Sequence, residues 1–400
     1  MRTNGTKMQR HVVVAAVGVM LILAGCGGGI DGRARSERLD DLADLRRCPD
    51  PLVIQTDWFP EPEHGALYHL TAGEGRVDPT SGHFRGPLAA TVDPEAASEG
   101  GGDEEQDEVE PPVTLEIRAG GPFLDDRTPL EIMVDDPDVF LGYVNTDVAI
   151  ANHEDIPTTA VVAPLEINPQ IIMWDPDTYE IGSWDDVRDT DATISHAPGV
   201  LYTDFLVGAD LVDVDQLADT YDGRPTRFIA QGGALIQQGF ATREPYTYEN
   251  VLVDWGRPVA SLLVHDAGYE IYQGPLAILS ERLDADARAC LAALVPLIQQ
   301  AVVDFQRDPS VTNELLVDVV DDLGTAWDLT DDGALATVVE MGSLGIVANG
   351  SNATVGDFDF ERLEAVMATM AERVASVDVP SDMRAQDVAT NEFIDPDIGL

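Results

Sequence analysis

Aromatic and acidic side chains gather directly after the first strand that the sequence predicts. Residues 52–56 alternate as a strand does, and the segment that follows, residues 57–68, reads DWFPEPEHGALY. Open α/β sheets bind their ligands at the carboxyl ends of strands. An indole beside carboxylates suits a flat ligand that carries an amine or a positive charge. We therefore expect four side chains to line a binding site: Asp57, Trp58, His64 and Tyr68. The alternative is that the aromatic rings only pack a turn and the core.

A second polar and aromatic group lies about 180 residues further along the chain. Residues 237–246 read QQGFATREPY and have the composition of a strand exit, after a predicted strand at 227–230 and a predicted helical turn at 233–238. The long separation suggests that the two groups form opposite walls of a cleft. We expect Glu244 and Tyr246 on the second wall, with packing of the aromatic ring as the alternative.

The sequence contains partial matches to catalytic and metal-binding motifs, but none has the residues or the spacing that its chemistry requires. Residues 341–345 read MGSLG, similar to a nucleophile elbow, but the last histidine of the chain, His265, precedes them. Residues 328–333 begin like a calcium loop, yet the twelfth position is Val339 instead of an acid. Lys7 is the only lysine and stands in the N-terminal leader, so no Schiff base to a pyridoxal cofactor is available. We predict a binding protein without cofactor or metal, not an enzyme.

The two motifs resemble a known family. Residues 54–68 resemble the opening of solute-binding lipoproteins of ABC importers in the nitrate/sulfonate/taurine group, and residues 238–246 are similar to the second signature of its thiamine-pyrimidine-binding-like branch. The resemblance covers roughly residues 51–72 and 113–310. It implies a type II periplasmic-binding-protein-like fold of class α/β. Each of two lobes would be a largely parallel sheet flanked by helices, with the ligand in the cleft between them. Matched position by position, it adds Ser195 and His196 to the ligand-facing residues.

The resemblance also implies a function. The chain would capture a small pyrimidine-like or amine-bearing heterocycle, similar to a thiamine precursor, by hinge closure and deliver it to an ABC permease, acting as a monomer. Carboxylates in both motifs disfavour an anionic ligand, although helix N-termini alone can hold an anion. An alkyl-sulfonate, taurine or flavin-like ligand therefore stays open, as does a secreted enzyme on the same fold.

The N-terminus predicts export on a lipid anchor. Arg2, Lys7 and Arg10 precede the apolar stretch 12–25, which is too short for a comfortable transmembrane helix and suits a signal peptide. It ends in LAGC, so we expect Cys26 to be acylated and to hold the protein at the outer face of the cell membrane.

The remainder divides into expected domains. These are a signal peptide at 1–25, a lipidated tether at 26–50, the first part of lobe 1 at 51–162, lobe 2 at 163–249, and the second part of lobe 1, with a helical C-terminal region, at 250–400. An acidic insert at about 94–111 has no core-forming residues and is expected to be disordered.

The charge of the chain excludes some binding partners, and its cysteines allow one disulfide. After residue 25 the chain has 73 acidic and 20 basic side chains, a formal net charge of −53. Such a surface repels nucleic acid and anionic headgroups, so the lipid anchor is the only membrane contact that we expect. Cys48 and Cys290 remain in an oxidising compartment, where they form either a disulfide or two buried thiols.

Overall fold

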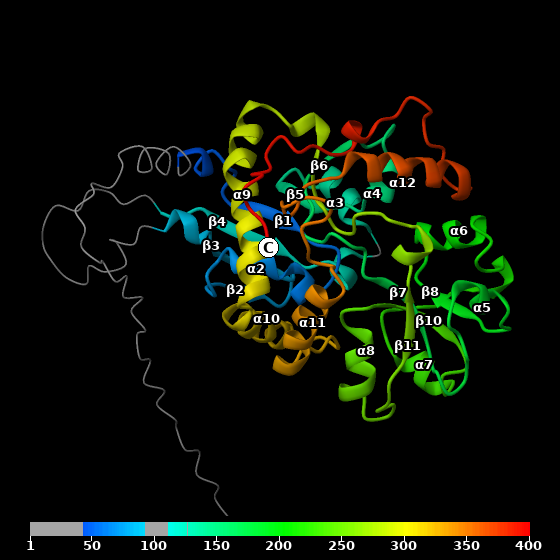
Figure 1. The fold of residues 1–400 in the computed structure, drawn as a ribbon. Coiled ribbons are helices and arrows are strands. Elements are labelled where there is room, and N and C mark those ends of the chain that lie inside the picture. The colour runs from blue at the N-terminus through cyan, green and yellow to red at the C-terminus, as the bar shows by residue number, and fades with distance from the viewer. Residues whose placement is uncertain (1–42, 93–110, 126) are drawn as a thin grey trace, which may run out of the picture. The chain divides into compact units, whose positions relative to one another are not determined.

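The computed structural model describes residues 43–92, 111–125 and 127–400. The predicted signal peptide, Cys26 and nearly all of the predicted acidic insert lie outside these residues. Two sheets organise the described part of the chain, one in each of two lobes (Figure 1).

Lobe 1 is built on a seven-stranded sheet with the order β2-β3-β4-β1-β5-β12-β6. Its central strand β1 is buried along its length, because Leu52 and Ile54 point into one hydrophobic core and Val53 points into the other. The strands are β1 (Leu52–Gln55), β2 (Arg76–Asp78), β3 (His83–Pro87), β4 (Thr114–Arg118), β5 (Val139–Tyr143), β6 (Thr158–Val162) and β12 (Leu276–Leu279).

Lobe 2 is built on a five-stranded sheet with the order β11-β7-β10-β8-β9. The strands are β7 (Gln170–Trp174), β8 (Ile194–His196), β9 (Leu217–Asp219), β10 (Ile236–Phe240) and β11 (Ala260–Leu263). Because β11 pairs with β7, this lobe extends beyond residue 249, where the sequence analysis placed its end.

Both sheets are mixed, whereas the sequence analysis expected largely parallel ones. In lobe 1, β1 runs parallel to β4 and β5, but β12 runs antiparallel to both β5 and β6. The reason is the path of the chain: β6 leaves lobe 1, and β12 is the strand on which the chain returns. In lobe 2, β7 is antiparallel to β10 and β11 for the same reason.

The helices cover these sheets. They are α2 (Gly65–His69), α3 (Pro129–Asp135), α4 (Thr146–Ala151), α5 (Trp184–Arg188), α6 (Leu201–Gly208), α7 (Thr226–Ala230), α8 (Glu244–Tyr246), α9 (Ala285–Arg307), α10 (Ser310–Leu323), α11 (Asp331–Ser343) and α12 (Phe360–Arg373). Shorter helical turns are η1 (Pro62–His64), η2 (Ala89–Thr91), η3 (Gly121–Leu124), η4 (Val214–Gln216), η5 (Thr247–Val251), η6 (His265–Ala267), η7 (Ser280–Arg282) and η8 (Ala385–Asp387).

Two elements of lobe 2 have the opposite secondary structure from the one predicted. Residues 227–230, predicted as a strand, belong to α7, and the predicted helical turn at 233–238 contains the start of β10. Pro225 directly precedes α7 and favours a helix start, although Phe228 and Ile229 prefer strands. Ile236 is fully buried, and β10 fills the gap between β7 and β8, so tertiary pairing decides its conformation.

Helix α9 is the central helix of lobe 1. By length and composition it could cross a membrane, but Leu291, Leu294 and Ile298 are fully buried in a hydrophobic core of this lobe. The structure joins Cys290 of α9 to Cys48 by a disulfide, which connects the segment before β1 to the C-terminal region. We therefore read α9 as a core helix.

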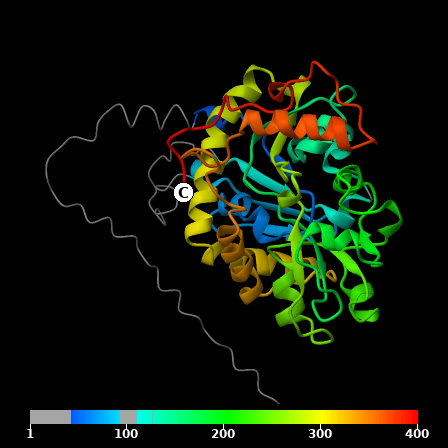
Figure 2. The ribbon, with the colours of Figure 1, turned by 45° about the vertical axis from the view of Figure 1, so that its right-hand side comes forward.

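Two linkers connect the lobes, and Arg362 of α12 binds both of them. The linkers are residues 163–169, between β6 and β7, and residues 264–275, between β11 and β12. The Arg362 guanidinium donates to Glu166 O and Oε1, both at 2.9 Å, and to the carbonyls of Glu270 and Ile271 at 2.7 and 3.0 Å. Helix α12 itself (orange-red in Figure 2) contacts α4 of lobe 1 and α6 of lobe 2.

Candidate functional site

The segment after β1 is held by its own histidine. A proline at the first position of η1 favours a helical start there. His64 at the end of this turn is buried, and its Nε2 lies 3.0 Å from Asp57 Oδ1. The ring packs edge-on against Tyr143 of β5, with centroids 5.1 Å apart. Asp57 and His64, both selected from the sequence, are therefore in contact.

Trp58 lies between backbone segments of the two lobes. A Cβ atom added to Gly121 of lobe 1 would lie 3.1 Å from Trp58 Cε3, and one added to Gly223 of lobe 2 would lie 2.9 Å from Trp58 Cζ2. Both glycines have positive φ, +60° and +79°, which other L-residues rarely adopt. Glycine thus permits both the turn and the close approach of the indole.

Aromatic rings beside Trp58, together with Arg243, connect the two lobes. The ring of Phe59 is stacked on that of Trp327, with centroids 5.2 Å apart. Trp327 stands in the loop between α10 and α11, and the guanidinium carbon of Arg243 lies 3.6 Å from its ring centroid. Arg243 of lobe 2 also donates to Asp328 O at 3.1 Å. These cation–π and hydrogen-bond contacts join lobe 2 to the C-terminal part of lobe 1.

Glu63 makes a polar contact across the lobes. The hydroxyl of Thr242, in the turn after β10, donates to Glu63 Oε1. We call the region where these contacts meet the seam; it is formed by Trp58, Phe59, Glu63, Gly223, Thr242 and Arg243.

Three glutamates gather at the seam with one arginine. Glu63 and Glu244 are 6% and 7% exposed, and Glu61 is partly exposed. Burial raises the pKa of Glu63 and of Glu244, and the charge of each glutamate acts on a neighbour. Loss of solvent, then the charges of Glu63 and Asp57, raise the pKa of Glu61 well above its ordinary value. Arg243 opposes all three shifts without cancelling them.

Glu244 is positioned by the strand that it follows. Its Oε2 accepts a hydrogen bond from Phe240 N at 2.7 Å. A Cβ atom on Gly239 would lie 2.9 Å from Glu244 Cγ, so a glycine at position 239 leaves the space that the Glu244 side chain occupies. Burial and the Glu244 charge raise the pKa of the Tyr221 hydroxyl well above its ordinary value, which indicates that Tyr221 also lies beside this carboxylate.

Five buried polar atoms on segments that meet at the seam have no hydrogen-bond partner. They are Glu63 Oε2, His64 Nδ1, Tyr143 Oη, Gln237 Oε1 and Trp327 Nε1. The Tyr143 side chain is 4% exposed, and burial, followed by the charges of Asp57, Glu61 and Glu63, raises its pKa. Its hydroxyl therefore lies near three carboxylates and donates to none of them. Such atoms are rare in folded proteins and need an explanation.

The remaining predicted residues have local partners. Ser195 Oγ lies 2.7 Å from Thr220 Oγ1. His196 Nδ1 lies 2.9 Å from Ala197 O and 3.4 Å from Asp219 Oδ1. Both side chains are buried on β8, next to β10, and neither contacts a seam residue in these bonds.

Tyr246 lies near the boundary between the lobes, whereas Tyr68 lies in the core of lobe 1. A Cβ atom added to Gly333 of α11 would lie 3.7 Å from Tyr246 Cε1, so this tyrosine of lobe 2 faces the C-terminal part of lobe 1. Tyr68 is 1% exposed and packs against Phe84 in a core of lobe 1, with ring centroids 5.0 Å apart. The packing alternative thus describes Tyr68 better than a ligand contact.

Sequence reasoning missed several residues of the seam. Glu61, Glu63, Thr242 and Arg243 lie inside the two quoted motifs and could have been selected as the charged or hydroxyl-bearing positions between the selected ones. Trp327 and Tyr143 stand in no motif. Only the fold brings them to the seam, so the sequence carried no signal for them.

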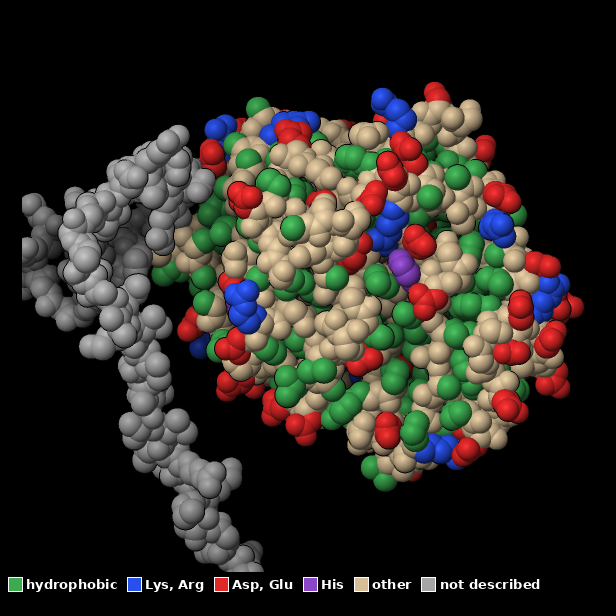
Figure 3. Space-filling model, in the orientation of Figure 1, with side chains coloured by type: hydrophobic (Ala, Val, Ile, Leu, Met, Phe, Trp, Pro, Cys, Tyr) green, Lys and Arg blue, Asp and Glu red, His purple; other side chains and the backbone are tan. Residues whose placement is uncertain are grey.

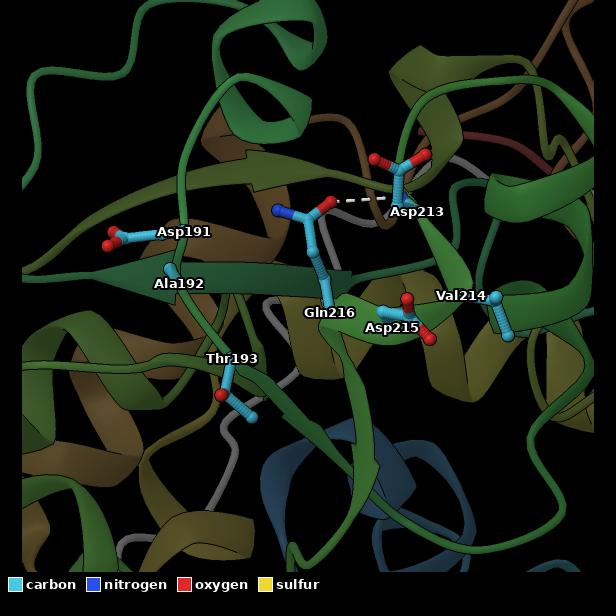
Figure 4. Close-up of a pocket in the computed structure, with 7 residues that line it drawn as sticks. All are labelled: Asp191, Ala192, Thr193, Asp213, Val214, Asp215 and Gln216. Carbon is cyan, nitrogen blue, oxygen red and sulfur yellow. Dashed lines mark hydrogen bonds between the residues drawn. The ribbon is translucent and has the colours of Figure 1, made fainter.

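A separate hollow lies on lobe 2 (Figure 4). Its volume is about 530 Å³, and its lining is Asp191, Ala192, Thr193, Asp213, Val214, Asp215 and Gln216. Among these seven residues, Gln216 has the only buried polar side chain. Its amide group already has hydrogen-bond partners, because Oε1 accepts from Asp213 N and Nε2 donates to the carbonyls of Val187 and Thr190. The hollow therefore offers exposed carboxylates but no unused buried group.

The electrostatic surroundings are acidic. On the face drawn in Figure 3, acidic side chains are spread over both lobes and basic ones are few. Within the residues that the structure describes, no group of three or more His, Cys, Asp or Glu side chains is arranged to hold a metal ion.

Solved structures of other proteins share this architecture. A protein from Bordetella bronchiseptica RB50 aligns with a TM-score of 0.53 and 10% identity, over 86% of this chain and 95% of its own. The periplasmic aliphatic sulphonate binding protein SsuA from Escherichia coli aligns with 0.48 and 12%, over 84% and 95%. A Candida albicans gene product with the generic periplasmic binding protein structural fold aligns with 0.40 and 11%, over 84% and 99%.

The likeness to the Bordetella bronchiseptica protein shows that the two chains share a fold over most of their lengths, in keeping with the two α/β lobes of this chain. At 10% identity it shows the fold alone. No family model matches the sequence, and no curated protein matches it.

Proposed function

We propose that the chain is an exported solute-binding protein of an ABC importer, held at the outer face of the membrane through Cys26. Its solute is a small pyrimidine-like or amine-bearing heterocycle, similar to a thiamine precursor, bound at the seam and passed to a membrane permease. The observation that carries the proposal is the seam itself. Side chains from both motifs meet there, and two linkers and α12 also join the lobes.

Hinge closure follows from this arrangement. A solute that contacts both lobes stabilises the closed form relative to the open form, because the open form has only half of the contacts. The contacts of Gly223 with Trp58 and of Thr242 with Glu63 join the two lobes, and they support closure as the form in which the solute is held.

The residues at the seam favour a flat solute with hydrogen-bond donors. Trp58 offers an indole face, and Glu244 and Asp57 offer carboxylate oxygens for amino groups. An alkyl sulfonate would place its negative charge beside Glu61, Glu63 and Glu244, and the ionised form of each of them repels it.

A native mass spectrum of the freshly purified protein identifies a solute that co-purifies, and a thermal-shift titration then measures its affinity. A solute with a Kd of about 1 μM stabilises the protein by ~2.7 kcal/mol at a 100-fold excess over Kd. Incubation with that solute should give no new mass, since a carrier returns its solute unchanged. A chemical product would instead establish an enzyme on this fold.

Trp58→Ala tests the site directly. Removal of a buried aromatic anchor should weaken solute binding by about 100-fold, whereas Trp58→Phe, which keeps a ring, should retain most of the affinity. Both variants should unfold at urea concentrations close to that of the native protein. Unchanged affinity of Trp58→Ala would place the solute elsewhere.

A further inference from the structure

The charge balance of the seam is incomplete. Glu61, Glu63 and Glu244 influence one another's ionisation, and Arg243 is the cation that acts on all three. The guanidinium of Arg243 already contacts the Trp327 ring and donates to Asp328 O, and it lies 3.8 Å from Glu244 Oε1. One partly engaged cation therefore faces three carboxylates.

The hydrogen-bond balance is incomplete at the same place. Glu63 Oε1 accepts the Thr242 hydroxyl, but Glu63 Oε2 is buried without a partner. The hydroxyl of Tyr143, on which the charge of Glu63 acts, is also buried without a hydrogen-bond partner. A buried polar or charged group without a partner is strongly unfavourable, so an N–H donor that reaches Glu63 Oε2 gains much from binding here.

The titratable and hydroxyl-bearing groups around Glu63 are Asp57, Glu61 and His64 from its own segment, Tyr143 from β5, and Thr242, Arg243 and Glu244 from lobe 2. Helices α9 and α11 place Phe305, Gln306 and Met341 beside it. His64 Nε2 lies 3.0 Å from Asp57, and the charge of His64, like that of Arg243, lowers the pKa of Glu63.

We propose that the seam binds its solute as a cation, an ammonium or amidinium group, that replaces protons on Glu63 and its neighbouring glutamates. This inference rests on the proposed function and adds to it the charge of the solute and a dependence on pH. Without a bound cation the glutamates hold protons, because loss of solvent and the charges of neighbouring carboxylates disfavour their ionised forms. A cation with two N–H donors supplies both the charge and the hydrogen bond that Glu63 Oε2 lacks, and the displaced protons pass to solvent.

A structural role for Glu63 is the competing explanation. Glu63 also borders a cavity of about 10 Å³ between η1, α9 and α11, next to Phe305 and Met341. That volume admits at most a single water molecule and no solute. Under this explanation Glu63 would be satisfied inside lobe 1, and its charge would not affect the choice of solute.

Three probes of one shape separate these explanations. Benzamidinium, benzamide and benzoate share a flat ring and differ in charge, and their charges stay constant between about pH 5 and 8. Calorimetric titration of the full chain should show benzamidinium binding at least tenfold more tightly than benzamide, with benzoate weakest. Titration in two buffers of different ionisation enthalpy should show proton release with benzamidinium alone. Its affinity should rise with pH, by up to tenfold per pH unit for each proton released.

Glu63→Gln keeps the size of the side chain and removes its charge. It should cut the preference for benzamidinium over benzamide by at least tenfold and reduce the number of protons released. Glu314→Gln, an exposed carboxylate of α10, makes the same change in net charge and should alter neither value.

Equal binding of the three probes, tighter binding of benzoate, or no binding of benzamidinium overturns the inference. So does a Glu63→Gln variant with the native preference and proton release. The co-purified solute tests the proposed function separately. An anionic solute that is bound without turnover would support the solute-binding function and contradict the cationic solute. Absence of any solute that binds the protein would remove both.

Discussion

Glu116 in β4 and Glu63 at the seam are both buried carboxylates of lobe 1, but their surroundings differ. Glu116 is 0% exposed and has two cationic partners, Arg118 Nε at 2.6 Å and Arg85 Nε, and His83 Nδ1 lies 3.3 Å from it. Burial alone would raise the pKa of Glu116, yet hydrogen bonds from Arg118 and Arg85 hold it below its ordinary value. Glu63 has a hydroxyl partner, and its pKa is raised.

Glu166, in the linker bound by Arg362, lies between these two cases. Arg362 donates to its carboxylate at 2.9 Å, but Asp357 and Asp359 are neighbours of the same sign. Burial raises the pKa of Glu166 to about 7, with the charges of Asp357 and Asp359 adding to the shift and Arg362 opposing it. The comparison teaches that the balance between burial, neighbouring carboxylates and hydrogen-bonded cations decides whether a buried carboxyl group keeps its charge.

The largest expected effect is therefore at the paired carboxylate. Glu116→Gln removes the carboxylate that Arg85 and Arg118 share and leaves Arg118, whose side chain is 11% exposed, with Asp136 as its remaining countercharge; it should lower the free energy of unfolding by about 3 kcal/mol. Glu63→Gln removes a carboxyl group that has no hydrogen-bonded cation and should leave that free energy unchanged or raise it. Urea denaturation of the two variants beside the native protein measures both. Equal losses would mean that the two regions do not differ as we describe.

A smaller effect is expected at the linker, and it depends on pH. The pKa of Glu166 is about 7 in the folded protein, whereas in the unfolded chain it returns to the ordinary glutamate value of 4.5. Unfolding thus releases a proton between these values, so rising pH favours the unfolded state. The stability advantage of the native protein over Glu166→Gln should fall by roughly 2 kcal/mol between about pH 5 and 8, after allowance for solvent screening.

Measuring the difference between the two proteins isolates Glu166 from other groups. His69, His83 and His265 have pKa values lowered by burial and act in the opposite direction, since the unfolded chain binds more protons there. Paired denaturation curves at each pH remove these shared contributions. A difference that stays constant from pH 5 to 8 would contradict the raised pKa of Glu166.

Local patterns in the sequence predicted the class of fold and part of the seam. Alternating strands and helices indicated α/β lobes, and the two motifs marked both sides of the seam, because each motif is one continuous turn after a strand. Asp57, Trp58 and Glu244 could be selected this way. The directions of β12 and β7 could not, since they follow from the chain's passage between lobes.

Residues brought to the seam from distant positions could not be predicted. Trp327 lies in a loop after α10, and its contact with Arg243 depends on how α10 and α11 pack beside η1. Tyr143 ends a buried strand and resembles any core aromatic residue in the sequence. Tyr68 was selected for the opposite reason: it shares a motif with seam residues, but α2 turns it into the core.

The smallest expected effect separates closure of the seam from the stability of the lobes. Gly223→Ala adds a methyl group 2.9 Å from Trp58 Cζ2, and Gly232→Ala adds one with nothing within 4 Å. Both glycines have positive φ, +79° and +63°, so both variants carry a similar backbone strain of about 1 kcal/mol. Only Gly223→Ala obstructs the approach of the two lobes, so it alone should weaken solute binding, by about tenfold, or 1.4 kcal/mol. Small-angle scattering with saturating solute should show a larger radius of gyration for Gly223→Ala than for Gly232→Ala. Equal affinities of the two variants would show that Trp58 and Gly223 need not meet when the solute binds, and the seam would then be a packing contact like the one around Glu116.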